Sequence, residues 1–141
     1  MSPRQILFPM VALAALTFIV LLLIPVARFR AAARRQVTAA DFRYGESANV
    51  PGDVSLPNRN LMNLLELLVL FYVGCLAFYV TETVDTAAVV LAWAYVALRA
   101  AHSAIHLSYN KVFHRLAAFA ASNVVLVALW VRWVLALPQG T

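Results

Sequence analysis

The chain has 141 residues, of which 64% are hydrophobic and only 12% charged, and its formal net charge is +5. Soluble domains carry about 25% charged residues. The composition therefore excludes a disordered chain, a nucleic-acid-binding tail and most soluble folds. It predicts one all-α integral membrane domain over residues 1–141. The lone Cys75 rules out an intrachain disulfide and is expected to be a small packing residue.

The first apolar run covers residues 6–27. At about 1.5 Å per residue it extends about 33 Å, enough to cross an apolar core of about 30 Å. A cleaved signal peptide is the alternative. The run is longer than the usual apolar region of about 7–15 residues, and only Arg4 precedes it as a positive charge. The sequence therefore predicts an uncleaved first span.

A polar stretch over residues 28–57 follows, and it is expected to be a cytoplasmic loop after a short helical extension. It contains five arginines and then four helix-breaking residues: Arg28, Arg30, Arg34, Arg35 and Arg43, then Gly45, Pro51, Gly52 and Pro57. No helical periodicity is visible after Thr38.

Three further spans are predicted over residues 58–80, 86–107 and 112–137. The fully apolar part of the second begins only at Leu67, so its polar start must be helical as well if it is to cross the membrane. The short links between the later spans force antiparallel neighbours, which makes a four-helix transmembrane bundle. Pro138 and Gly140 are expected to end the last helix.

The distribution of positive charge predicts the orientation. The first loop and the 108–115 connection carry Lys and Arg, whereas the 81–85 link carries none. By the positive-inside rule both basic connections face the cytoplasm and both termini lie on the other side. In a bacterium this would be the inner, or plasma, membrane. Arg132 does not fit this rule. We expect its long side chain to extend so that the guanidinium group reaches the membrane interface.

Arg59, Asn63 and Glu66 form a polar row at the start of the second span. At about 100° per residue all three lie on one helix face, within about 60° of arc. A cation, an amide and an anion presented together predict a binding pocket at the cytoplasmic end of the bundle. The alternative is an interhelical salt-bridge network that only stabilises packing.

A second row on the third span consists of Arg99, His102 and His106, and Tyr95 extends it. Two His four residues apart allow a metal site, but no carboxylate or Cys on this span completes the ligand set, so no metal is predicted. Hydrogen bonds to a facing helix or to a ligand carboxylate are expected instead.

Arg115, at the start of the fourth span, could reach into the bundle or out to lipid headgroups.

The spacing Arg59-x-x-x-Asn63-x-x-Glu66 resembles the helix-two signature of the MAPEG family, the membrane-associated proteins of eicosanoid and glutathione metabolism. The segment from Leu98 to Arg115 is similar to the third-to-fourth helix segment of bacterial members. Chain length, span number, the long first loop and topology agree, and the resemblance covers nearly the whole chain.

The resemblance implies a left-handed homotrimeric bundle that binds glutathione as co-substrate between subunits, near the cytoplasmic face. It assigns Arg59, Asn63 and Glu66 to the charged ends of the tripeptide. Arg115 matches the arginine that stabilises the thiolate in the family's transferases. The expected function is a glutathione transferase or peroxidase that acts on small apolar electrophiles entering from the membrane lipids, with no nucleic acid partner.

The third span departs from the family pattern. His102 and His106 stand where the glutathione-conjugating members place tyrosines, and with Arg99 they complete the expected glutathione-binding set. The alternative is therefore a protein of the same fold without glutathione chemistry, in a lipid-binding or accessory role. A channel or transporter is a weaker hypothesis, because the sequence predicts no pair of broken helices.

Overall fold

The computed structural model describes residues 2–137 of the chain. Five α-helices and two short 3-10 helices make up this part. In chain order they are η1 (Pro3–Ile6), α1 (Leu7–Ala33), η2 (Ala39–Phe42), α2 (Gly52–Leu65), α3 (Leu68–Val80), α4 (Thr86–Leu107) and α5 (Val112–Ala136). Four helical segments of the described residues, Pro3–Ala33, Gly52–Val80, Thr86–Leu107 and Val112–Ala136, are long and apolar enough to span a membrane. The chain is an all-α, multi-pass integral membrane protein.

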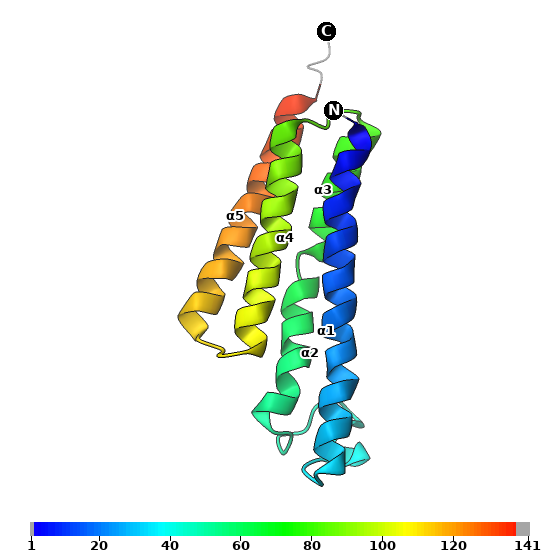
Figure 1. Cartoon of the computed structure of the whole chain (residues 1–141), viewed down its shortest axis with the longest axis vertical. Coiled ribbons are helices and arrows are strands. Elements are labelled where there is room, and N and C mark those ends of the chain that lie inside the picture. The colour runs from blue at the N-terminus through cyan, green and yellow to red at the C-terminus, as the bar shows by residue number, and fades with distance from the viewer. Residues whose placement is uncertain (1, 138–141) are drawn as a thin grey trace.

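The helices lie roughly parallel to one long axis (Figure 1). α4 and α5 pack against each other as an antiparallel pair, and α1 packs against α2, α3 and α4. η1 and the last turn of α5 lie at one end of the bundle, here called the terminal end. The 34–51 loop and the 108–111 turn lie toward the other, here called the loop end. Every predicted polar row lies on this second half of the molecule.

The first loop is shorter than the sequence predicts. α1 continues to Ala33, where a short helical extension is expected, but α2 already begins at Gly52, so Pro57 lies inside a helix and the irregular segment covers only residues 34–51. The cause is a small apolar cluster in which the two helix ends and the loop bury side chains together: Ala31, Val37, Val50 and Val54, with Phe42 packed against them. Pro138 and Gly140, expected to end the last helix, lie outside the described residues.

The second span contains a break that the sequence does not predict. α2 ends at Leu65 and α3 begins at Leu68, with Leu67 at φ −117° and ψ 6° between them. The carbonyl of Asn63 accepts a hydrogen bond from the guanidinium of Arg99 on α4. Within the described chain the N–H of Leu67 donates no backbone hydrogen bond. A side chain that occupies a carbonyl of the helical ladder breaks the helix, so Arg99 accounts for the break.

α3 and α5 approach closely at Gly74. A Cβ added there would lie 3.4 Å from Nε1 of Trp130, and this indole donates a hydrogen bond of 3.2 Å to the carbonyl of Leu70. Small residues at such crossings let membrane helices pack without a gap. Gly74 therefore makes room for the Trp130 ring against α3.

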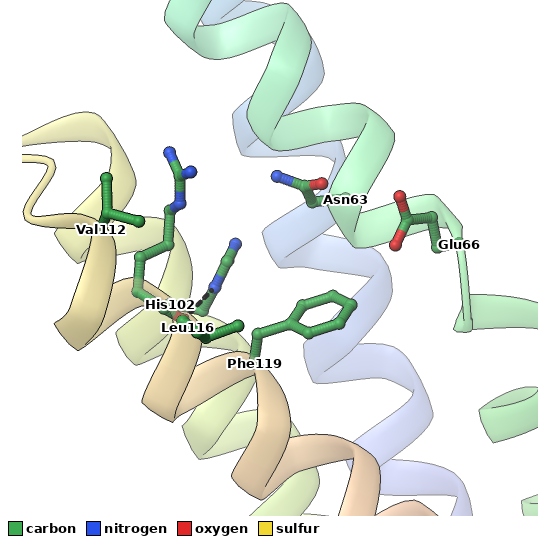
Figure 2. Close-up of a pocket in the computed structure, with 7 residues that line it drawn as sticks. Asn63, Glu66, His102, Val112, Leu116 and Phe119 are labelled. Atoms are coloured by element: carbon green, nitrogen blue, oxygen red, sulfur yellow. Dashed lines mark hydrogen bonds between the residues drawn. The ribbon is translucent and has the colours of Figure 1, made fainter.

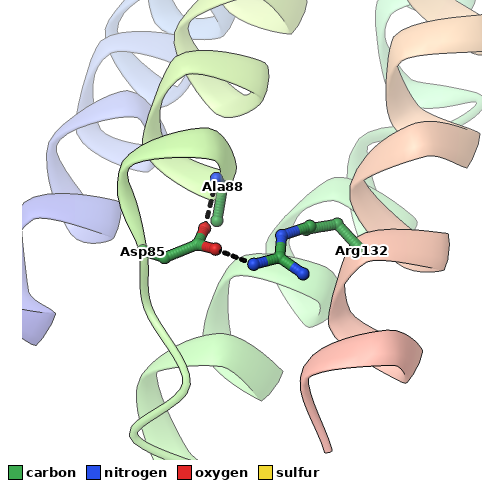
Figure 3. Close-up of polar contacts among 3 residues, drawn as sticks. All are labelled: Asp85, Ala88 and Arg132. Carbon is green, nitrogen blue, oxygen red and sulfur yellow. Dashed lines mark hydrogen bonds and ion pairs between the residues drawn. The ribbon is translucent and has the colours of Figure 1, made fainter.

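The terminal end has its own polar contact (Figure 3). Asp85 caps α4 by accepting a hydrogen bond of 2.8 Å from the N–H of Ala88, and its other oxygen pairs with the guanidinium of Arg132 on α5. Trp133 donates to the hydroxyl of Thr81 at 3.2 Å. The charge of Arg132 is thus neutralised by a carboxylate of the same chain, which the sequence did not predict.

This ion pair predicts a pH dependence of stability. Burial alone would raise the pKa of Asp85, but the Ala88 N–H and the Arg132 guanidinium outweigh it and hold the pKa below its ordinary value of 3.8. A lowered carboxyl pKa stabilises the fold above about pH 4, and this contribution disappears as the pH falls through the folded-state pKa. Because both side chains are about one-third exposed, we expect less than about 1 kcal/mol at neutral pH.

The matched variant is Asp85→Asn, which keeps the helix cap and removes only the charge. We expect thermal unfolding in detergent to separate wild type from Asp85→Asn at pH 7 and to bring the two together below pH 4. A difference that stays constant across this range would contradict the assignment.

Candidate functional site

Two adjoining cavities lie between α2, α4 and α5 toward the loop end. The first, here called the Glu66 cavity, has a volume of about 250 Å³ and is lined by Asn63, Glu66, His102, Val112, Arg115, Leu116 and Phe119. The second, the Arg59 cavity, has about 320 Å³ and is lined by Leu56, Asn58, Arg59, Met62, Asn63, His106, Asn110 and Arg115. Asn63 and Arg115 line both, so the two cavities form one site. Most of the predicted site residues meet there.

The polar row on α2 divides between the two cavities. Arg59 lines one and Glu66 lines the other, and Asn63 lies between them as the helical spacing predicts. Arg59 and Glu66 are exposed and Asn63 is partly buried. Among residues 2–137 neither charged side chain forms an ion pair. Among the described residues Arg59 and Glu66 therefore form no interhelical salt bridge.

Arg115 reaches into the bundle. Its Nη1 donates a hydrogen bond of 2.9 Å to Oδ1 of Asn110, in the turn that precedes α5. Asn110 adopts a left-handed conformation with φ 48°, which Asn tolerates better than most residues. Its N–H donates 2.8 Å to the carbonyl of Ile105. The turn thus holds the guanidinium between the two cavities.

Both histidines are buried in the wall of the site. Nδ1 of His102 lies 3.1 Å from the backbone carbonyl of Arg115, and the His102 ring packs against Phe119 in the Glu66 cavity (Figure 2). Nδ1 of His106 lies 3.4 Å from Oδ1 of Asn60, a fully buried amide on α2. Asn60 is not predicted from the sequence as a site residue. Its partner His106 lies on another helix, and the contact becomes evident only once α2 and α4 pack together.

Arg99 occupies a different place from the other predicted residues. Its side chain is 0% exposed and lines neither cavity. The guanidinium binds the Asn63 carbonyl, and its central carbon lies 5.1 Å from the centre of the Phe119 ring. Arg99 therefore acts behind the cavity wall, where it holds the end of α2.

The end of α2 places a carboxylate where helix electrostatics disfavour it. Glu66 is the C-terminal cap residue, and a helix C-terminus carries a partial negative charge of its own. The positive charge of Arg99 lies close enough to Glu66 to interact with it. Such a conflict with local rules is expected at functional sites. Two guanidinium groups, a carboxylate and an amide around a small cavity can bind a ligand that carries both signs of charge.

No three His, Cys, Asp or Glu side chains of the described residues gather into a set that could hold a metal ion.

Comparison with known proteins gives one finding. No curated protein and no solved structure matches the chain. The family model described as MAPEG family matches residues 6–135, which is nearly the whole chain. The chain therefore belongs to the MAPEG family of membrane helical bundles, which includes both glutathione-dependent enzymes and proteins without enzymatic activity.

Proposed function

We propose that this protein binds glutathione and is a transferase or peroxidase that uses it against small apolar electrophiles. The observation that carries the proposal is the meeting of Arg59, Asn63, Glu66 and Arg115 around two adjoining cavities. Arg59, Asn63 and Glu66 match the family's helix-two signature, Arg115 is the nearest equivalent of its thiolate-stabilising arginine, and family membership supports their assignment to glutathione.

The ligand's chemistry fits this set. Glutathione carries two carboxylates, one ammonium group and a thiol. Arg59 can bind a carboxylate through two parallel hydrogen bonds, and Glu66 can accept from the ammonium group. The attacking species is the thiolate, which a neighbouring guanidinium stabilises, and Arg115 is the proposed source of that charge.

The proposed assembly is a homotrimer with the loop end in the cytoplasm and both termini on the other side. Two features support this orientation and assembly. Arginines concentrate at the loop end, as the positive-inside rule requires of a cytoplasmic face. Large apolar side chains along α1 are exposed, which suits contact with lipid or with a neighbouring subunit: Phe8, Val11, Phe18, Leu22 and Phe29.

Calorimetric titration of the detergent-solubilised protein with glutathione tests the proposal. Wild type is expected to bind saturably, and Arg59→Ala and Glu66→Ala are each expected to weaken binding about 10- to 100-fold, the value of a charged hydrogen bond. Arg43→Ala is the matched control, because Arg43 lies in the same end of the molecule and lines neither cavity. Absence of saturable binding to wild type, or equal losses in all three variants, would refute the proposal.

A second candidate function is lipid binding without glutathione chemistry. It is favoured by an apolar groove of about 450 Å³ between α3 and α5, lined by Leu67, Leu70, Asn123, Leu126, Val127, Trp130 and Val131. Asn123 in this groove has a buried Oδ1 without a partner among the described residues. This candidate predicts bilayer lipid retained after purification and no turnover of a chloro-dinitrobenzene substrate. Turnover that depends on Arg115 would exclude it.

A further inference from the structure

The hydrogen bond of His102 fixes which of its ring nitrogens carries the proton. Nδ1 lies 3.1 Å from the backbone carbonyl of Arg115. A carbonyl oxygen can only accept, so Nδ1 must be the donor. A neutral imidazole has a single N–H. Nε2 of neutral His102 is therefore a hydrogen-bond acceptor.

This acceptor has no partner in the protein. Nε2 is buried, and among residues 2–137 nothing donates to it. The side chain is 2% exposed and lines the Glu66 cavity together with Arg115. Figure 2 shows the ring nitrogen that is not bonded to the carbonyl pointing toward the side of the cavity where Asn63 lies. Buried polar atoms are nearly always satisfied, so an orphan acceptor on a cavity wall indicates a ligand that brings a donor.

We propose that Nε2 of His102 is the general base that accepts the thiol proton of glutathione. The inference rests on the proposed function and adds a catalytic residue to it. Arg115 can stabilise an anion but cannot take up a proton, because a guanidinium is already fully protonated. His102 and Arg115 line one cavity and thereby divide the task between a proton acceptor and a fixed positive charge.

The proposed proton transfer and substitution use only His102, the thiol and the electrophile. The S–H bond of the thiol breaks and an N–H bond forms at Nε2, so that the electron pair stays on sulfur and His102 becomes an imidazolium. The thiolate then forms an S–C bond with the electrophile, and the bond from that carbon to its leaving group breaks. The imidazolium returns the proton to the leaving group or, when an epoxide opens, to the new alkoxide.

The surroundings of His102 combine charges of both signs. The charged and titratable groups around it are Arg99 and His106 on its own helix, Arg115 on α5 and Glu66 at the end of α2. The two guanidinium groups repel an imidazolium, whereas Glu66 and the newly formed thiolate attract it. A thiolate–imidazolium pair is thus expected in the glutathione complex before the proton is passed on.

Two substitutions separate the roles of the ring nitrogens. In His102→Asn the side-chain NH2 can replace Nδ1 as donor to the Arg115 carbonyl, and the base at Nε2 is lost. In His102→Gln the amide can reach the position of Nε2, but an amide accepts no proton. General-base catalysis contributes about 10²- to 10⁴-fold, so both variants are expected to keep glutathione affinity within about threefold and to lose at least about 100-fold in turnover at neutral pH. Turnover should rise again as the pH is raised and the thiol ionises unaided.

The deciding measurement is the ultraviolet absorbance of the thiolate of bound glutathione as a function of pH. In both His102 variants its titration should move to higher pH, a change that a merely structural loss would not produce while affinity is retained. His114→Gln is the control, because His114 is exposed, contacts Tyr109 and lines neither cavity. Unchanged thiol titration and turnover in His102→Asn, with glutathione bound, would overturn this inference alone. A wild-type protein that binds no glutathione would overturn the proposed function as well.

Discussion

Replacing Arg115 with alanine is expected to lower glutathione-dependent turnover of a chloro-dinitrobenzene substrate by about 10²- to 10³-fold, the usual effect of removing a group that stabilises developing charge. Arg115 lines both cavities, and Asn110 holds its guanidinium in place. Glutathione binding should weaken by about tenfold at most, because the carboxylates and the ammonium group keep their partners. The loss therefore falls mainly on kcat, which steady-state kinetics measure together with calorimetric affinity.

Arg115→Lys refines this prediction. A lysine keeps the positive charge but has no planar fork, so its donors are not fixed in the directions of Asn110 and of a thiolate as those of the guanidinium are. We expect turnover between those of wild type and Arg115→Ala. Lys111→Ala is the control for charge in general, because Lys111 is exposed in the same turn and lines neither cavity. An Arg115→Ala variant with the kcat of wild type would remove Arg115 from the mechanism.

Arg99→Ala is expected to have the largest effect on stability. The side chain is fully buried, so truncation leaves a large cavity and also removes the hydrogen bond that Arg99 donates to the Asn63 carbonyl. Losses of this type cost roughly 3–5 kcal/mol. Thermal unfolding in detergent should show a clearly lower midpoint, whereas Ser103→Ala, a buried change on the same helix, should stay within about 1 kcal/mol of wild type.

Arg99→Met separates packing from the hydrogen bond. Methionine fills most of the space but cannot donate to the Asn63 carbonyl, which is then free to accept from the N–H of Leu67. The break between α2 and α3 should close and turn Glu66 away from its cavity. We expect glutathione affinity to fall about tenfold, at a smaller cost in stability than Arg99→Ala. A methionine variant that binds glutathione as wild type does would contradict this account of the break.

The features that sequence predicts well are those with local causes. Composition and run length give the four membrane-spanning segments, and short links give the antiparallel neighbours. Helical periodicity places Arg59, Asn63 and Glu66 on one face, and the structure shows them along one site. Each of these conclusions depends on residues within one continuous segment of the chain.

The features that sequence misses depend on distant partners. No Pro or Gly lies between Leu65 and Leu68, and the break there follows a contact between Asn63 and Arg99, which are 36 positions apart. The amide that meets His106 lies 46 positions away, at Asn60. Such pairs become visible only once the helices are packed.

The early start of α2 has a similar cause. Val54 is buried against Ala31 at the end of α1, and this contact outweighs the helix-breaking tendency of Gly52 and Pro57.

The contact at Asp85 also fixes the register of two helices. Asp85 joins the start of α4 to Arg132 near the end of α5, while His102 joins the same two helices at the Arg115 carbonyl. Along α4 these two interhelical contacts are about 25 Å apart. A slip of α5 along α4 by one turn, about 5.4 Å, would break both at once. The alignment of imidazole and guanidinium in the Glu66 cavity is therefore secured in part by an ion pair at the opposite side of the membrane-spanning region.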